Sequence, residues 1–146
     1  MLLGFKRRFE PYVLDGSKRH SIRAFRKRYF RAGDICDCYG DVRQTSMHLL
    51  GRFPCVRVEI ISIFHRGDGS LAVYIGGQEL TASEKDLLAW RDGFRSNGSE
   101  ARPCGCFAEM TDFWLEEHGV RPHRYAPRSL DFQGQIIYWS RLDLDR

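Results

Sequence analysis

The sequence predicts a small α+β domain in which a mixed, mainly antiparallel sheet curls into a β-barrel with flanking helices. Several short segments have the apolar patterns of strands, turn signals separate them, and two helical patterns occur late in the chain. Consecutive short strands joined by tight turns favour closure into a barrel. A length of 146 residues suits one domain, so we expect residues 1–146 to form a single unit.

The first part of the chain predicts three strands and one short helix. Leu2–Arg8 can form the first strand. Glu10–Gly16 is typical of a short helix, because Pro11 stands early, where its missing N–H is tolerated, and the glycine can end the helix. Strands are expected at Arg19–Ala24 and, after a Gly-Asp turn, at Ile35–Tyr39.

The clearest strand pattern covers Phe53–His65. Polar Arg57 and Glu59 alternate with apolar neighbours, which predicts one buried face. That face is expected to consist of Val56, Val58, Ile60 and Phe64. A Gly-containing hairpin loop then leads into an antiparallel strand at Leu71–Ile75.

The last part of the chain predicts two helices and a final strand. Thr81–Glu84 fits a capping box, which opens a helix that stops at Gly93. Residues 95–106 are polar and contain Gly and Pro, so they are expected to form a loop. Aromatic residues at helical spacing predict a second helix over 107–118, and Gln135–Ser140 is expected to be a largely buried strand.

Positive charge is concentrated at the N-terminal end. Residues 1–31 contain ten Lys or Arg and two acids, whereas residues 32–146 contain thirteen Lys or Arg and seventeen acids. Such asymmetry favours a basic face directed at an anionic partner, although the Arg26-Lys-Arg run can also be a solvated loop. Basic clusters often mark nucleic-acid patches, so the charge predicts a polyanion, including single-stranded nucleic acid in general, as the partner.

Location and cofactors follow from what the chain lacks. No apolar run approaches the ~20 residues of a membrane-spanning helix. The apolar stretch at the N-terminus is too short for a signal peptide, so we expect a cytoplasmic protein without a membrane partner. Five cysteines, an odd number, favour reduced thiols. Two C-x-C pairs do not fit the usual zinc spacing, so neither a metal nor another cofactor is expected.

Three groups of motifs carry a resemblance to a known family. They are Gly4–Phe9 with Val13–Arg23, Gly33–Gly40 with Arg43 and Thr45, and Arg91–Phe94 with Glu109-Met110, Phe113-Trp114 and Gly134–Trp139. In this order they resemble the ASCH family of PUA-like proteins over most of the chain, with residues 95–106 as an apparent insertion. The resemblance implies a fold similar to PUA, EVE and YTH domains and recognition of RNA or of a modified nucleoside. Some ASCH proteins hydrolyse acetylated cytidine nucleosides, and some have been associated with RNA cleavage.

The same resemblance implies a possible catalytic set of Lys18, Ser21 and Asp92. A desolvated lysine with a lowered pKa can remove the proton of a hydroxyl, and a carboxylate can hold the lysine or pass a proton to a leaving amine. Lys18 and Ser21 converge only if Lys18 lies in the turn before the strand or if a bulge intervenes. We therefore leave open whether the protein is an amidohydrolase, a ribonuclease or no enzyme.

Ligand binding makes fewer demands on the same region. Besides Lys18 and Ser21, the residues expected to bind a nucleic acid or nucleoside are Arg23, Tyr39, Arg43, Thr45 and Trp139. Arg23 shares a strand face with Ser21, and an aromatic such as Trp139 can stack on a base. Two alternatives remain: Trp139 can be a core residue, and Arg23 can form an ion pair with Asp92. Neither His20 nor His118 is expected at the cleft.

Overall fold

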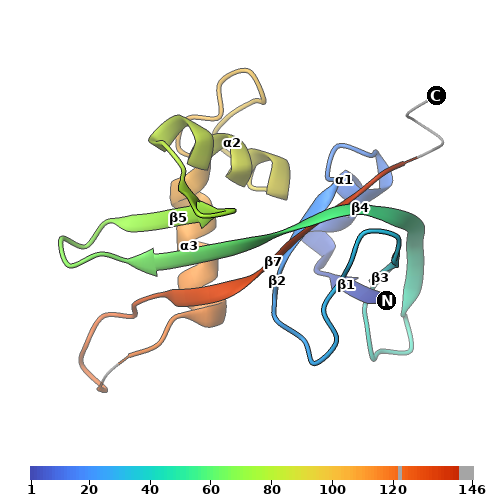
Figure 1. Cartoon of the computed structure of the whole chain (residues 1–146), viewed down its shortest axis with the longest axis horizontal. Coiled ribbons are helices and arrows are strands. Elements are labelled where there is room, and N and C mark those ends of the chain that lie inside the picture. The colour runs from blue at the N-terminus through green and yellow to red at the C-terminus, as the bar shows by residue number, and fades with distance from the viewer. Residues whose placement is uncertain (122, 142–146) are drawn as a thin grey trace.

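The computed structural model describes residues 1–121 and 123–141 (Figure 1). In chain order the elements are β1 (Leu2–Phe5), the 3₁₀ helix η1 (Arg7–Phe9), α1 (Glu10–Leu14), β2 (His20–Ala24), β3 (Ile35–Gly40), β4 (His48–His65), β5 (Leu71–Ile75), β6 (Gln78–Glu79), α2 (Ala82–Asp92), α3 (Cys106–His118) and β7 (Asp131–Trp139). The predicted α+β class with a mainly antiparallel sheet is confirmed. None of these helices has the length and apolar character that a membrane crossing requires.

Strand β4 organises the sheet, because its two halves pair with different partners. The first half pairs with β3, and β3 in turn pairs with β1 in parallel. The second half lies between β5 and β7, both antiparallel to it, and β7 also pairs with β2. In Figure 1, β4 and β7 run side by side along the molecule, with β1, β3 and α1 near one end and α2 and α3 near the other.

The expected closure into a barrel is not confirmed. The chain of pairings runs from β1 through β3 to β4, and β2 joins the sheet only through β7. Among the described residues β1 and β2 share no ladder, so the sheet stays open between these two strands. The Arg23 side chain bridges them, since its Nη2 on β2 donates a hydrogen bond to the Gly4 carbonyl of β1 at 2.6 Å. This opening matters because the site described below lies beside it.

The prediction of which face of β4 is buried is wrong. Val56 and Ile60 are 52% and 60% exposed, whereas Cys55, Ile61 and Ile63 are buried. The ladder with β7 shifts its register between Cys55 and Arg57. The nearest buried residues on both sides of this shift are odd-numbered, so the core lies on the face opposite to the predicted one. Alternation predicts two faces, and the packing of α3 against Ile61 and Ile63 decides which of them is buried.

The start of the chain also departs from the expected long first strand. Strand β1 ends at Phe5, and the chain then turns into η1, which leads directly into α1. This turn brings the buried ring of Phe9 against Phe94 and Phe113, with ring centroids 5.4 and 5.7 Å apart. Aromatic rings therefore connect the N-terminal segment to the region of α2 and α3.

Both ends of α2 follow local sequence signals. Thr81 caps the first turn, with Glu84 N–H donating to Thr81 Oγ1 and Thr81 N–H donating to the Glu84 carboxylate, as the capping box predicts. At the other end Gly93 has φ = 119°, and a Cβ placed there would lie 2.6 Å from Phe9 Cδ1. Glycine is therefore required both by the backbone conformation and by the close approach of Phe9. This fixes Asp92, the last residue of the helix, against the N-terminal segment.

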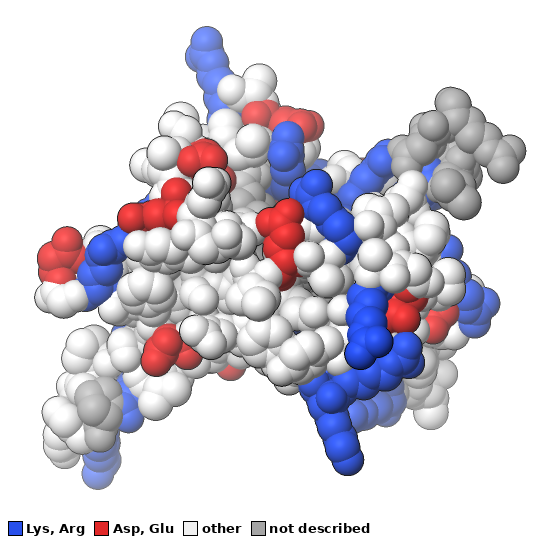
Figure 2. Space-filling view, viewed as in Figure 1, with Lys and Arg blue, Asp and Glu red and all other residues white. Residues whose placement is uncertain are grey.

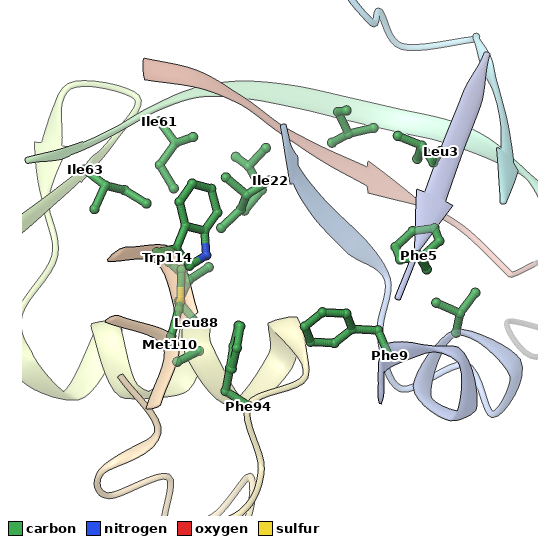
Figure 3. Packing of buried hydrophobic residues seen from close by; sticks show 14 of the residues in the cluster. Leu3, Phe5, Phe9, Ile22, Ile61, Ile63, Leu88, Phe94, Met110 and Trp114 are labelled. Atoms are coloured by element: carbon green, nitrogen blue, oxygen red, sulfur yellow. The ribbon is translucent and has the colours of Figure 1, made fainter. Parts of the chain in front are cut away.

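One hydrophobic core joins the two ends of the molecule (Figure 3). Ile61 and Ile63 of β4 face Trp114 and Met110 of α3. Trp114 also packs edge-to-face on Phe132 of β7, with ring centroids 4.6 Å apart. Helix α3 therefore covers the β4–β7 face of the sheet, as its stripe of apolar residues predicts.

Candidate functional site

A pocket of about 200 Å³ opens where β1 and β2 are not paired. Its wall comes from the end of β1 and the segment after it, from β2 and the turn before it, from the last residue of α2, and from one face of α3. We call it the N-terminal pocket. Segments that are distant in sequence thus meet at one concave site.

Aromatic and aliphatic side chains form much of the wall. Phe5 and Phe9 come from the N-terminal segment, Ile22 from β2, and Phe113 and Trp114 from α3. In Figure 3 Phe5 and Phe9 lie on one side of β2, with Ile22 and Trp114 on the other. Such a wall offers ring faces and edges to a flat, partly apolar ligand.

The predicted residues Lys18, Ser21, Arg23 and Asp92 all line this pocket. Lys18 precedes β2 and lies in the turn after α1, where its backbone N–H donates to the Tyr12 carbonyl at 2.9 Å. From this turn its side chain reaches the same pocket as Ser21, which is the first of the two geometries that the sequence left open. The pocket therefore contains an ammonium, a hydroxyl, a guanidinium and a carboxylate.

Lys18 and Asp92 form a buried ion pair at the base of this arrangement. Lys18 Nζ donates to Asp92 Oδ1 at 2.7 Å and to the Asp92 backbone carbonyl at 2.6 Å. The second bond satisfies a carbonyl at the end of α2, where a lysine interacts favourably with the helix dipole. Lys18 therefore caps α2 in addition to neutralising Asp92.

Burial and charge shift the pKa values of this pair. Burial lowers the pKa of Lys18, and the Asp92 carboxylate opposes the shift only in part. Burial by itself raises the pKa of Asp92, but the Lys18 ammonium and the neighbouring His20 together outweigh it, so the pKa of that carboxyl lies well below its ordinary value. Asp92 is thus ionised at neutral pH.

Arg23 and Ser21 share one face of β2 and are in contact. Arg23 Nε donates to Ser21 Oγ at 2.7 Å, and Nη2 donates to the Gly4 carbonyl at 2.6 Å. Burial lowers the pKa of Arg23 to about 10, so the guanidinium remains charged at neutral pH. Within the described residues Arg23 makes these bonds and no ion pair with Asp92, which pairs with Lys18 instead.

The other predicted binding residues do not reach the pocket. Tyr39 lies on β3, and its hydroxyl accepts a hydrogen bond from Arg52 at 3.2 Å. Arg43 and Thr45 are exposed on the β3–β4 loop, where Arg43 has φ = 65°. Trp139 is buried in the core between Phe5 and Phe53, which is the alternative that its apolar strand suggested.

Two histidines that the sequence placed outside the site lie at or next to it. His118 lines the mouth of the N-terminal pocket with Lys6 and Glu117, which form an ion pair at 2.5 Å. His20 is buried, and its Nε2 lies 3.1 Å from Asp92 Oδ1. The ring N–H is not aligned with that oxygen, so Nε2 has no hydrogen-bond partner among the described residues. The alternation of side chains along β2 does separate His20 from Ser21. The sequence around His20 gives no signal that the Asp92 carboxylate of α2 lies beside it.

The thiols lie elsewhere. Cys36, Cys38, Cys55 and Cys106 are buried and Cys104 is exposed, all as free cysteines. Burial raises the pKa of Cys36 and of Cys38 to about 12, which keeps both as neutral core residues. Over the described part of the chain no three His, Cys, Asp or Glu side chains gather as a metal site.

Comparison of the chain with models of known protein families, with curated proteins and with solved structures finds no match. The likeness to ASCH proteins therefore stays a prediction that depends on the motifs quoted above.

Proposed function

We propose that this protein is a PUA-like domain of the ASCH type that binds a nucleoside or nucleotide, free or within RNA, in the N-terminal pocket. One observation carries the proposal: a guanidinium, a hydroxyl and several aromatic rings line the same concave site. The concentration of positive charge in residues 1–31 supports it, because charge of this sign attracts an anionic ligand.

Each group has a defined part in this binding mode. Arg23 Nη1 makes no hydrogen bond to other described residues, so it can donate to a phosphate or to a base edge. Ser21 can hydrogen-bond a base edge or a ribose 2′-hydroxyl. Phe5 and Phe113 supply aromatic surface for the base, whose stacking contributes about 1–3 kcal/mol.

Titration calorimetry with the four ribonucleoside 5′-monophosphates and with N4-acetylcytidine tests the proposal. We expect at least one of these to bind, and the affinity of a monophosphate to fall as salt is raised. Arg23→Gln is expected to weaken binding about tenfold or more, since a hydrogen bond to a charged group is lost. Arg124→Gln is the matched control, because Arg124 is exposed on the loop between α3 and β7. Absence of binding, or equal affinity of wild type and Arg23→Gln, would contradict the proposal.

A second candidate function is hydrolysis of an N4-acylated cytidine. The observation that favours it is that Lys18 and Ser21 line one pocket while burial lowers the pKa of Lys18, as a lysine acting as a base requires. With Lys18 as the neutral amine, the form that burial favours, Ser21 Oγ would attack the amide carbonyl while Lys18 Nζ takes its proton, and the C–N bond would break with that proton passing to the leaving amine. Water would then cleave the acyl-serine and release the acid.

Incubation with N4-acetylcytidine separates binding from hydrolysis. The hydrolase candidate expects cytidine and acetate in equal amounts, and loss of turnover in both Ser21→Ala and Lys18→Ala. Binding without any product assigns the pocket to recognition alone. Turnover that survives Ser21→Ala would remove Ser21 as the nucleophile.

A further inference from the structure

The loop between β2 and β3, residues 25–34, presents a basic surface next to the N-terminal pocket. Four of the six residues from Arg26 to Arg31 are Lys or Arg, and Asp34 is the one acid of the loop. Arg23 and Ala24, directly before the loop, line the pocket. Figure 2 shows Lys and Arg gathered along the lower edge of the molecule, where Figure 1 places this loop. The basic loop therefore begins directly after two residues of the pocket wall.

The backbone of the loop is anchored. Phe30 is buried, and the side-chain amide of Gln135 on β7 binds it from both sides: Phe30 N–H donates to Gln135 Oε1 and Gln135 Nε2 donates to the Phe30 carbonyl, each at 3.0 Å. The Asp34 carboxylate accepts the Arg31 N–H at 2.9 Å. Because these bonds fix the backbone, a ligand need not order the loop when it binds.

The cationic side chains of the loop differ in whether they contact other groups of the protein. Arg28 pairs with Asp34 at 3.1 Å, and the Arg26 guanidinium lies 5.2 Å from the centre of the Phe30 ring. Lys27 and Arg31 are exposed, and no carboxylate within the described ranges pairs with either. These two cations can contact phosphates without breaking an ion pair.

Two exposed aromatic rings accompany the cations. Phe25 and Tyr29 are 36% and 50% exposed, and their ring centroids lie 4.9 Å apart at an interplanar angle of 33°. Exposed rings beside cations are the surface on which unpaired bases stack, whereas the bases of a duplex are already stacked on one another. The combination therefore favours a single strand over a duplex and over an acidic protein.

We propose that the β2–β3 loop binds the nucleotides that flank the one in the N-terminal pocket, so that the ligand is single-stranded RNA and not a free nucleoside. Lys27 and Arg31 contact the phosphates, and Tyr29 with Phe25 stacks a neighbouring base. The inference depends on the proposed function of the pocket.

The test compares a short single-stranded RNA with the mononucleotide that binds best, using the whole 146-residue chain. Tyr29→Ala and the double variant Lys27→Gln/Arg31→Gln are each expected to weaken RNA binding at least about fivefold and to leave mononucleotide binding unchanged. For the double variant, the slope of log affinity against log salt should also fall by about 1.4. Arg121→Gln/Arg124→Gln removes the same charge from the distant α3–β7 loop and should leave RNA binding unchanged.

The outcomes separate the two proposals. RNA binding that is unchanged in Tyr29→Ala and in the double variant, but weakened by Arg23→Gln, overturns the role of the loop and leaves the pocket function standing. RNA binding that depends on the loop, without any mononucleotide binding, overturns the pocket function and with it the flanking-nucleotide role. Equal affinity for single-stranded RNA, duplex DNA and heparin at low salt would show that the loop binds any polyanion, and it would overturn the inference.

Discussion

The Lys18 ammonium and the Asp92 carboxylate, 74 positions apart in the sequence, lie 2.7 Å from each other with both side chains buried. Because Lys18 also bonds the Asp92 carbonyl, it joins the turn before β2 to the end of α2. Both segments contribute to the wall of the N-terminal pocket. The ion pair is thus part of the structure of the site as well as part of its chemistry.

Removal of Lys18 is expected to be costly. Lys18→Met leaves Asp92 as an uncompensated buried charge, which should lower the free energy of unfolding by about 3–5 kcal/mol. The double variant Lys18→Met/Asp92→Leu removes both charges and should recover much of that loss. Urea unfolding monitored by tryptophan fluorescence measures both. A Lys18→Met variant as stable as wild type would show that the pair does not hold the site together.

A pH dependence of stability is expected from His20. Burial lowers the pKa of His20, so the folded protein binds this proton more weakly than the unfolded chain does. The free energy of unfolding should therefore be highest above about pH 6.5 and fall as the pH drops below it, towards the folded-state pKa, by at most about 1.4 kcal/mol per pH unit.

Urea unfolding at several pH values between about 5 and 7.5 tests this expectation. His20→Leu should flatten the decline, because the variant has no proton to bind at this position. His123→Gln is the control, since it removes an exposed histidine on the loop between α3 and β7, outside the Asp92 contact. The same decline in wild type and in His20→Leu would assign the pH dependence to other groups.

Gln135 is expected to control the conformation of the β2–β3 loop. Gln135→Leu removes both side-chain bonds to Phe30 and leaves its N–H and carbonyl unpaired, which should cost about 1–3 kcal/mol. The freed loop should then be cut by trypsin between Arg26 and Arg31 faster than in wild type. Gln133→Leu is the matched control, because Gln133 lies on the same strand but is exposed. Equal cleavage rates in Gln135→Leu and wild type would show that the loop is held by other contacts.

A methyl group at position 93 is expected to disturb the wall of the pocket. Gly93→Ala places a side chain at φ = 119° and a Cβ 2.6 Å from Phe9, so a loss of at least about 1–3 kcal/mol is expected in thermal or urea unfolding. Since Phe9 lines the pocket, nucleotide affinity should fall as well. Gly67→Ala serves as the control, because a Cβ there has nothing within 4 Å. Gly93→Ala with wild-type stability and affinity would contradict the close packing of Phe9.

Signals carried by neighbouring residues were sufficient to predict many of the helices and strands. The Thr81–Glu84 capping box and the glycine after Asp92 gave both ends of α2, since the hydrogen bonds of a helix end involve residues a few positions apart. The buried face of β4 could not be predicted in the same way. Alternation predicts two faces but not which of them is buried, and that is decided by α3, which packs on Ile61 and Ile63 from more than forty residues further along the chain.

By itself the sequence determined the α+β class, the approximate positions of most helices and strands and the concentration of positive charge near the N-terminus, because propensity, capping and side-chain periodicity are local. It also singled out Lys18, Ser21, Arg23 and Asp92. Only the tertiary structure decided that these four share one pocket, that the Tyr39–Thr45 segment stays outside it, and that His20 lies against Asp92. Those relationships depend on how α2 and α3 pack against β1 and β2, and such long-range packing produces no periodic pattern in the sequence.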